Sequence, residues 1–223
     1  MIIFDKNTFK PFDYVLILGV LTTTLLYSWL THEFDTLGFI ASMTGLINVV
    51  LVARGKISNY IFGIVNVALL AYIYFASKLW GNAVLYTVYF LPMQFIGWIQ
   101  WNKKKSDETT VKARHITRKE TIIFTSAGIV AIVALTLILK SLNDAQPLLD
   151  ASLNILSIAA MFMMVRAISE QWTIWCLINL IEMITWIILT VNGTEHAATM
   201  LIMRTFYLVN SINGLLQWKK LAK

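Results

Sequence analysis

Residues 121–139 read TIIFTSAGIVAIVALTLIL, a run without a single charged side chain. A helix rises about 1.5 Å per residue, so about 20 apolar residues are enough to cross the ~30 Å hydrocarbon core of a bilayer. Runs of this kind recur along the whole chain. We predict eight transmembrane helices, near residues 12–31, 36–53, 57–76, 80–101, 119–140, 148–168, 172–192 and 197–218.

The composition of the whole chain agrees with this prediction. Of the 223 residues, 58% are hydrophobic and 13% are charged, whereas a soluble domain has about a quarter of its residues charged. The mean hydropathy of +0.70 therefore indicates an all-α integral membrane protein. The sequence contains no nucleotide-binding or hydrolase motif, the three histidines are scattered, and Cys176 is the one cysteine. We expect no enzyme activity, no cofactor and no metal site.

The basic residues predict the orientation of the helices. With the N-terminus inside, 15 of the 17 Lys and Arg residues in loops, termini and helix ends lie on the cytoplasmic side, as the positive-inside rule requires. Both termini are then cytoplasmic. This topology also accounts for the net charge of +6, so a nucleic-acid partner is not needed to explain it.

The two halves of the chain resemble each other. The segment Gly97–Lys104, GWIQWNKK, is similar to Gly214–Lys220, GLLQWKK, and upstream Asn66 corresponds to Asn179 and Arg54 to Arg166. Because one connecting helix separates the units, they have the same orientation in the membrane and form parallel repeats. The predicted organisation is an N-terminal helix and outer loop at 1–35, a first three-helix repeat at 36–101, a basic loop and connector helix at 102–147, and a second repeat at 148–223.

Four uncharged amides lie at one depth in the predicted bundle. Asn66, Gln94, Asn179 and Asn210 are all roughly 10–14 Å from the inner interface. An amide in hydrocarbon needs a hydrogen-bond partner. Either these side chains join neighbouring helices, or they form a ring that binds a neutral, hydrogen-bonding part of a solute.

Several tryptophans lie deeper than an interfacial belt requires. Trp172, Trp175 and Asn179 are spaced i, i+3 and i+7 on one helix face, and Trp98 and Trp175 are a turn or more inside their helices. Their rings could stack on a flat ligand or hold a pyridinium by cation–π attraction.

Two charged residues are placed well inside the predicted helices. Glu182 and Arg204 differ in depth by about one helical turn, so we predict a structural ion pair between them. Pro92 has no backbone N–H and is predicted to distort the fourth helix just before Gln94.

Four sequence segments together resemble the PnuC family of vitamin transporters. They are KISNYIFGIVNV at 56–67, QFIGWIQW at 94–101, LSIAAM at 156–161, and EQWTIW at 170–175 followed by Asn179. The resemblance covers residues from about 36 to 220.

The resemblance implies a transporter of nicotinamide riboside in the bacterial inner membrane, which works by facilitated diffusion with alternating access. It also implies a core like that of SWEET sugar transporters, with three-plus-one-plus-three helices and an extra N-terminal helix, in a homo-oligomer that is a trimer. A cytoplasmic kinase would trap the riboside by phosphorylation. The alternatives are a thiamine or riboflavin transporter of the same family, or a membrane scaffold that transports nothing. The expected substrate-binding residues are Gln94, Trp98, Trp175, Asn179 and Asn210, together with Trp172 and Asn66.

Overall fold

The computed structural model describes residues 8–32, 35–76, 80–144, 146–192 and 197–222. This part of the chain contains helices and no strand, so the all-α prediction is confirmed. The elements are α1 (Pro11–Thr31), α2 (Thr36–Ala53), α3 (Asn59–Ala76), α4 (Trp80–Val84), η1 (Leu85–Phe90), α5 (Leu91–Lys103), α6 (Arg118–Ser141), α7 (Pro147–Val165), α8 (Gln171–Val191) and α9 (Ala197–Leu221). Each predicted run matches one helical rod, the fourth of which consists of α4, η1 and α5.

Six of the described helices are long and apolar enough to cross a bilayer: α1, α2, α3, α6, α7 and α8. The fourth rod is divided into three shorter elements, and α9 carries Arg204 in its interior.

The fourth rod changes its helix type just before Pro92. Residues Leu85–Phe90 form a π-helix, and the Leu91 N–H donates to the Tyr86 carbonyl five residues earlier. Proline cannot donate a backbone hydrogen bond and crowds the preceding turn, and a π-helical turn is one way a helix absorbs such a disturbance. The distortion predicted at Pro92 thus takes the form of a π-helical turn, which directly precedes Gln94.

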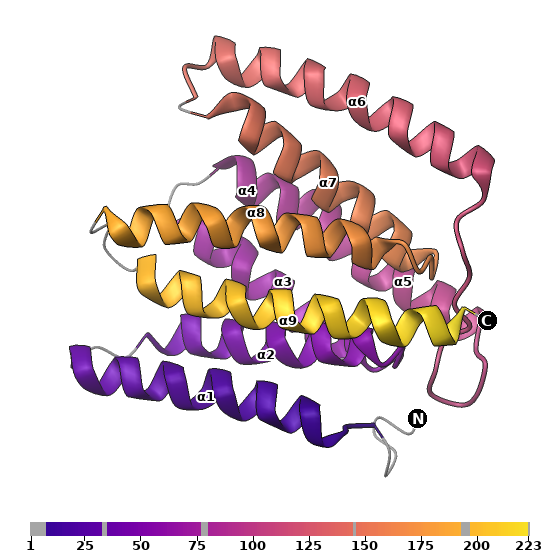
Figure 1. The fold of residues 1–223 in the computed structure, drawn as a ribbon, viewed down its shortest axis with the longest axis horizontal. Coiled ribbons are helices and arrows are strands. Elements are labelled where there is room, and N and C mark those ends of the chain that lie inside the picture. Colours follow the sequence, from indigo (N-terminus) through magenta and orange to yellow (C-terminus); the bar gives the residue numbers. More distant parts are fainter. Residues whose placement is uncertain (1–7, 33–34, 77–79, 145, 193–196, 223) are drawn as a thin grey trace.

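Six helices form a closed ring. Going round it, α2 packs against α3, α3 against α5, α5 against α7, α7 against α8, α8 against α9, and α9 against α2. Outside the ring, α6 packs on α7, while α1 lies against α2 and α9; Figure 1 shows these two helices at opposite edges of the bundle. α1 begins and α9 ends at the same end of the bundle (Figure 1). We call this the basic end, because the loop at residues 104–117 lies there.

Two tryptophans join the two halves of the ring, by which we mean α2–α5 and α7–α9, at the basic end. The Trp101 indole N–H of α5 donates to the Met164 carbonyl near the end of α7, at 2.9 Å. The Trp218 indole of α9 donates to the Val52 carbonyl near the end of α2, at 2.8 Å. Both indoles are fully buried. The last helix of each half is thereby hydrogen-bonded to the first helix of the other half.

The turns after α2 and α7 have the same geometry. Gly55 and Ala167 both adopt positive φ, 65° and 57°, and each donates its N–H to the carbonyl that also accepts a tryptophan bond. Counting from these two positions, Asn66 corresponds to Ile178 and not to Asn179. The equivalence that we drew between the two asparagines is therefore wrong by one residue, which is about 100° around a helix.

The last helices of the two halves, α5 and α9, show the same one-residue difference. With Trp101 and Trp218 matched by their indole bonds, the counterpart of Gln94 is Ser211, and Asn210 corresponds to Met93. The four amides do not therefore form a ring of equivalent positions, because each half places its amides on different faces.

A buried ion pair fastens α1 to the ring. The Arg54 guanidinium, at the end of α2, donates from Nε and Nη2 to the two carboxylate oxygens of Asp13, at 2.8 Å each. Asp13 is fully buried and also accepts the Lys10 N–H. Bidentate pairs of this kind are strong and directional. The position of the extra N-terminal helix is thus set by a contact with the first helix of the ring.

The basic loop is hydrogen-bonded to both turns. In one half, the Ile57 N–H donates to Thr109 and the Val111 N–H donates to Gly55, each at 2.9 Å. In the other half, the Arg114 N–H donates to Ala167, also at 2.9 Å. The loop therefore connects the α2–α3 turn to the α7–α8 turn across the basic end.

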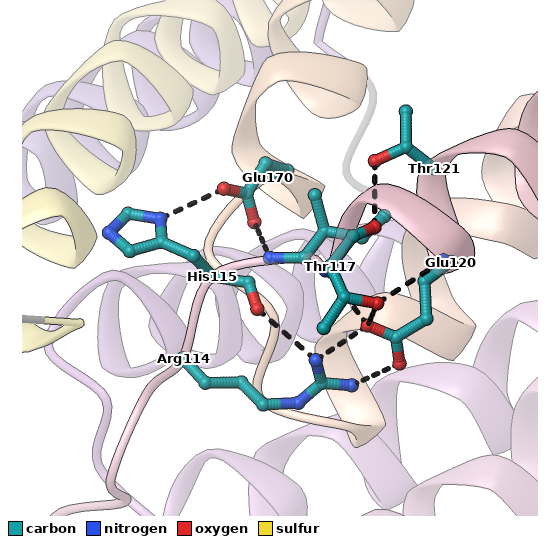
Figure 2. A network of polar contacts seen from close by, with 7 residues as sticks. Arg114, His115, Thr117, Glu120, Thr121 and Glu170 are labelled. Atoms are coloured by element: carbon teal, nitrogen blue, oxygen red, sulfur yellow. Dashed lines mark hydrogen bonds and ion pairs between the residues drawn. The ribbon is translucent and has the colours of Figure 1, made fainter.

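Side chains reinforce the second attachment (Figure 2). Glu170 accepts the Ile116 N–H and contacts the His115 ring, at 2.9 Å each. Arg114 makes a bidentate contact with Glu120, at 2.7 and 2.6 Å, and this carboxylate raises the pKa of Arg114. Glu120 forms a capping box with Thr117 at the start of α6, so the loop ends in a fixed helix cap.

We expect Trp101→Phe and Trp218→Phe each to lower the free energy of unfolding by about 1–2 kcal/mol, because each removes one indole–carbonyl hydrogen bond and some packing volume. Chemical unfolding in detergent micelles would measure this. Trp29, whose side chain is 71% exposed, provides the matched control, and Trp29→Phe should leave stability unchanged. Equal effects of all three substitutions would show that the two cross-bonds contribute no specific stability.

Candidate functional site

The four predicted amides lie on four different helices of the ring. Gln94, Asn179 and Asn210 are buried, with exposed fractions of 5%, 6% and 1%. Asn66 is half-buried and donates from Nδ2 to the Ala41 carbonyl of α2, at 2.7 Å. The site is therefore best described by what each amide contacts.

Gln94 packs against the backbone of α3 at a glycine. A Cβ atom added at Gly63 would collide with Gln94 Oε1 and lie 2.7 Å from Asn48 Nδ2 of α2. Asn48 itself donates to the Asn59 carbonyl, at 2.8 Å. The absence of a side chain at Gly63 thus lets two amides from different helices meet beside α3.

The amides of the second half meet at the α8–α9 and α2–α9 contacts. Asn179 donates from Nδ2 to the Ser211 hydroxyl, at 2.9 Å. The neighbouring Asn210 donates from Nδ2 to the Val49 carbonyl of α2, at 3.1 Å. Since Val49 follows Asn48, α2 connects the environment of Gln94 to that of Asn210.

The two ends of these amides have different roles. The NH₂ groups of Asn48, Asn66, Asn179 and Asn210 are each bonded to another group of the protein, three of them to a backbone carbonyl. In contrast, the buried oxygens Gln94 Oε1, Asn59 Oδ1 and Asn210 Oδ1 have no hydrogen-bond partner in the described part of the chain. Buried acceptors without a partner are uncommon in proteins and typical of sites that receive a donor from elsewhere. The NH₂ groups join the helices, and the oxygens remain available.

Three predicted tryptophans occupy different environments. Trp172 is 2% exposed and its ring packs over Gly214, with its centroid 6.3 Å from that of Trp218. Its indole N–H has no partner among the described residues. Trp175 is half-buried against the same core. Trp98 also touches this core, but it lines a pocket beside residues 105–109 of the basic loop.

Arg204 of α9 and Glu182 of α8 form an ion pair. Both side chains are partly buried, with 30% and 20% of their surface exposed. They line a pocket of about 360 Å³ that also includes Asp144, Asp150 and Trp186. An isolated charge at this depth would be expensive, and pairing removes most of that cost.

Sequence reasoning missed several polar residues of this region. They are Asn48, Asn59, Gln171, Tyr207 and Ser211, each of which is buried or meets one of the predicted amides. Tyr207 Oη, for example, lies beside Gly45 together with Asn66. The depth criterion that selected Gln94 could also have found Asn48, six residues before Arg54. Among the described residues no group of His, Cys, Asp or Glu could hold a metal ion.

Comparisons with known proteins agree with one another. Residues 35–220 match the family model described as nicotinamide mononucleotide transporter. The nicotinamide riboside transporter PnuC of Neisseria mucosa is 33% identical over 192 residues, 84% of this chain and 73% of that protein. The Haemophilus influenzae transporter of the same name is 31% identical, over 96% of this chain and 92% of its own length.

The fold matches a solved structure as well. The crystal structure of the vitamin B3 transporter PnuC superposes with a TM-score of 0.79 at 30% identity. The match covers 96% of this chain and 93% of that one.

We expect Gly63→Ala to disturb the site, since its methyl group would displace Gln94 or Asn48. Overpacking of this kind costs about 1–3 kcal/mol. The matched control is Gly128→Ala in α6, where an added Cβ meets nothing within 4 Å. Thermal unfolding of the two variants should show a lower transition temperature for Gly63→Ala alone. Equal transition temperatures would mean that α3 has room beside Gly63.

Proposed function

Because the chain belongs to the PnuC family of membrane transporters, which are not enzymes, we propose that it carries nicotinamide riboside across the bacterial inner membrane. The relatives from Neisseria mucosa and Haemophilus influenzae are nicotinamide riboside transporters. The observation that carries the proposal is the pair of buried, unpaired amide oxygens on Gln94 and Asn210.

These oxygens are complementary to the donors of the riboside. Its carboxamide NH₂ and its ribose hydroxyls can each donate a hydrogen bond, and a buried acceptor without a partner gains most from such a bond. The pyridinium ring is flat and cationic, which suits the faces of Trp172 and Trp175. We assign Gln94, Asn179, Asn210, Trp172 and Trp175 to the site, with Asn66 and Trp98 at its edges.

The charges of the interior favour the riboside over its phosphorylated form. A phosphate monoester carries about −1.5 to −2 charges at neutral pH and needs a cation when buried. Arg204 is the one basic side chain well inside a predicted helix, and it is already paired with Glu182. Arg54, at the end of α2, is held by Asp13.

The proposed orientation places the basic end in the cytoplasm, with both termini. The distribution of Lys and Arg supports it. We further propose two parallel three-helix repeats of the SWEET type, α2–α5 and α7–α9, with α6 as connector and α1 as an addition. The matching turns at Gly55 and Ala167 and the reciprocal tryptophan bonds support this division.

Transport would proceed by alternating access, as the two repeats rock against each other. The riboside would move down its own concentration gradient. Phosphorylation of the riboside by a cytoplasmic kinase would then retain it, because the added charge finds no free cation in the interior. We also propose a homotrimer. The exposed apolar surface of α6, which has no buried residue in the described chain, is available for contacts with lipid or with another subunit.

Titration of the purified protein should show saturable binding of nicotinamide riboside and much weaker binding of nicotinamide mononucleotide, thiamine and riboflavin. Gln94→Leu and Asn210→Leu should each weaken riboside binding roughly threefold to tenfold, as expected for one lost hydrogen bond. Asn154 is the control, because its amide bonds within its own helix to Asp150, and Asn154→Leu should bind normally.

Tight binding of thiamine or riboflavin instead would assign the chain to a different vitamin. Without saturable binding of any of these compounds, the scaffold alternative would be correct.

In liposomes that contain only this protein, labelled riboside should equilibrate without concentrating, whatever proton or sodium gradient is imposed. The reason is that the one intramembrane carboxylate in the described helices outside their first turns, Glu182, is already paired with Arg204. Accumulation above the external concentration would contradict facilitated diffusion, and Glu182→Gln would then be the first variant to test for loss of coupling.

A further inference from the structure

A pocket of about 660 Å³ lies at the basic end, outside the amide cluster. Its walls are the α2–α3 turn at Ile57 and Ser58, the first turn of α3 at Ile61, the last turns of α5 and residues 105–109 of the basic loop. A volume of this size is within the range of small-ligand sites, roughly 300–1,000 Å³. Of its lining residues, the proposed function uses only Trp98, at the edge of the riboside site.

Lining residues of the pocket share helix faces with exposed apolar side chains of α3 and α5. In α3, the lining residue Ile61 shares a face with Val65 and Tyr72, which are 43% and 60% exposed, whereas Tyr60 on the other side is fully buried. In α5, the lining residue Asn102 shares a face with Phe95 and Ile99, which are also exposed.

The apolar part of the pocket continues into this lipid-exposed surface. Ile57, Ile61 and Trp98 provide its apolar lining, and the exposed side chains of α3 and α5 extend from them along the two helices. A ligand that occupies the pocket can therefore place an apolar tail between α3 and α5 without leaving the hydrocarbon.

The polar part of the pocket carries both signs of charge. Lys105 supplies an ammonium group, and Asp107 and Glu108 supply carboxylates. Partial burial opposes ionisation of Asp107, but the N–H groups of Thr109 and Thr110, at 2.8 and 2.7 Å, outweigh it and lower the pKa of this carboxyl. Asp107 therefore stays negatively charged at neutral pH.

A ligand that matches this pocket has an anionic group for Lys105, a cationic hydrogen-bond donor for the carboxylates, and an apolar tail. We propose that the pocket binds the headgroup of a zwitterionic aminophospholipid, with its phosphate on Lys105 and its primary ammonium on Glu108 and Asp107. Charge complementarity of both signs at the membrane interface distinguishes this lipid from a purely anionic one, which Glu108 and Asp107 would repel.

Lipid binding here would act on the basic loop. Thr109, at the end of the lining segment, accepts the Ile57 N–H and so belongs to the attachment of the loop to the α2–α3 turn. A bound headgroup holds residues 105–109 against α3 and α5, which strengthens this attachment from the lipid side.

The test compares nanodiscs of two compositions, one with phosphatidylethanolamine and one with phosphatidylcholine, whose quaternary ammonium cannot donate a hydrogen bond. We expect a higher unfolding temperature with phosphatidylethanolamine. In native mass spectrometry we expect phosphatidylethanolamine to remain bound to the wild-type protein, and Lys105→Ala and Glu108→Ala to retain roughly tenfold less of it.

Lys112→Ala is the matched control, since Lys112 is exposed on the same loop and does not line the pocket; it should retain lipid as the wild type does. Asp107 is left unchanged because it shapes the loop. Equal stabilisation by the two lipids, or equal retention by all variants, would overturn the proposal. Displacement of the lipid by nicotinamide riboside would overturn it too, because the pocket would then belong to the transport path.

Discussion

The constraint on which this structure depends is that an amide in the apolar interior needs a partner at both of its ends. Asn66, Asn179 and Asn210 satisfy their NH₂ groups with atoms of neighbouring helices, which fixes where α3, α8 and α9 stand relative to one another. Backbone carbonyls are suited to this because their second lone pair is available even inside a helix. The oxygens of Gln94 and Asn210 are not used in this way. The NH₂ groups thus serve helix association, and the proposed riboside contacts fall on the oxygens that the described residues leave without a partner.

The basic end is closed by contacts of three kinds. Trp101 and Trp218 connect the two halves directly, the basic loop connects the turns at Gly55 and Ala167, and Glu170 strengthens the second of these attachments. Any opening at this end must break contacts from all three groups. The backbone hydrogen bonds among them can be exchanged for bonds to water at a modest cost each, whereas Trp101 and Trp218 also pack in the apolar core.

The sequence was informative about helices and much less so about contacts between them. Apolar run length located every rod within a few residues, since a bilayer imposes one length on all of them. The pairing of Asp13 with Arg54 could not be anticipated. The two residues are 41 positions apart, and hydropathy does not say which helices pack against each other. The equivalence of Asn66 and Asn179 was wrong because we aligned the two segments by identical residue types and not by the turns that precede them. A shift of one residue moves a helical side chain to another face. The depth criterion would have selected Asn48 as well, but the role of Ser211 depends on Asn179 and thus on a contact between two helices.

The two contacts that join α2–α5 to α7–α9, between α2 and α9 and between α5 and α7, are reinforced by different elements. At the contact between α2 and α9, α1 packs against both helices. Its buried Asp13 carboxylate also forms an ion pair with Arg54 at the end of α2. At the α5–α7 contact, Tyr89 of the adjacent π-helical turn donates from its hydroxyl to the Ile158 carbonyl of α7, at 2.7 Å, and α6 packs on α7. Of these two contacts, the one between α2 and α9 therefore gains a third helix and a buried ion pair from the N-terminal part of the chain.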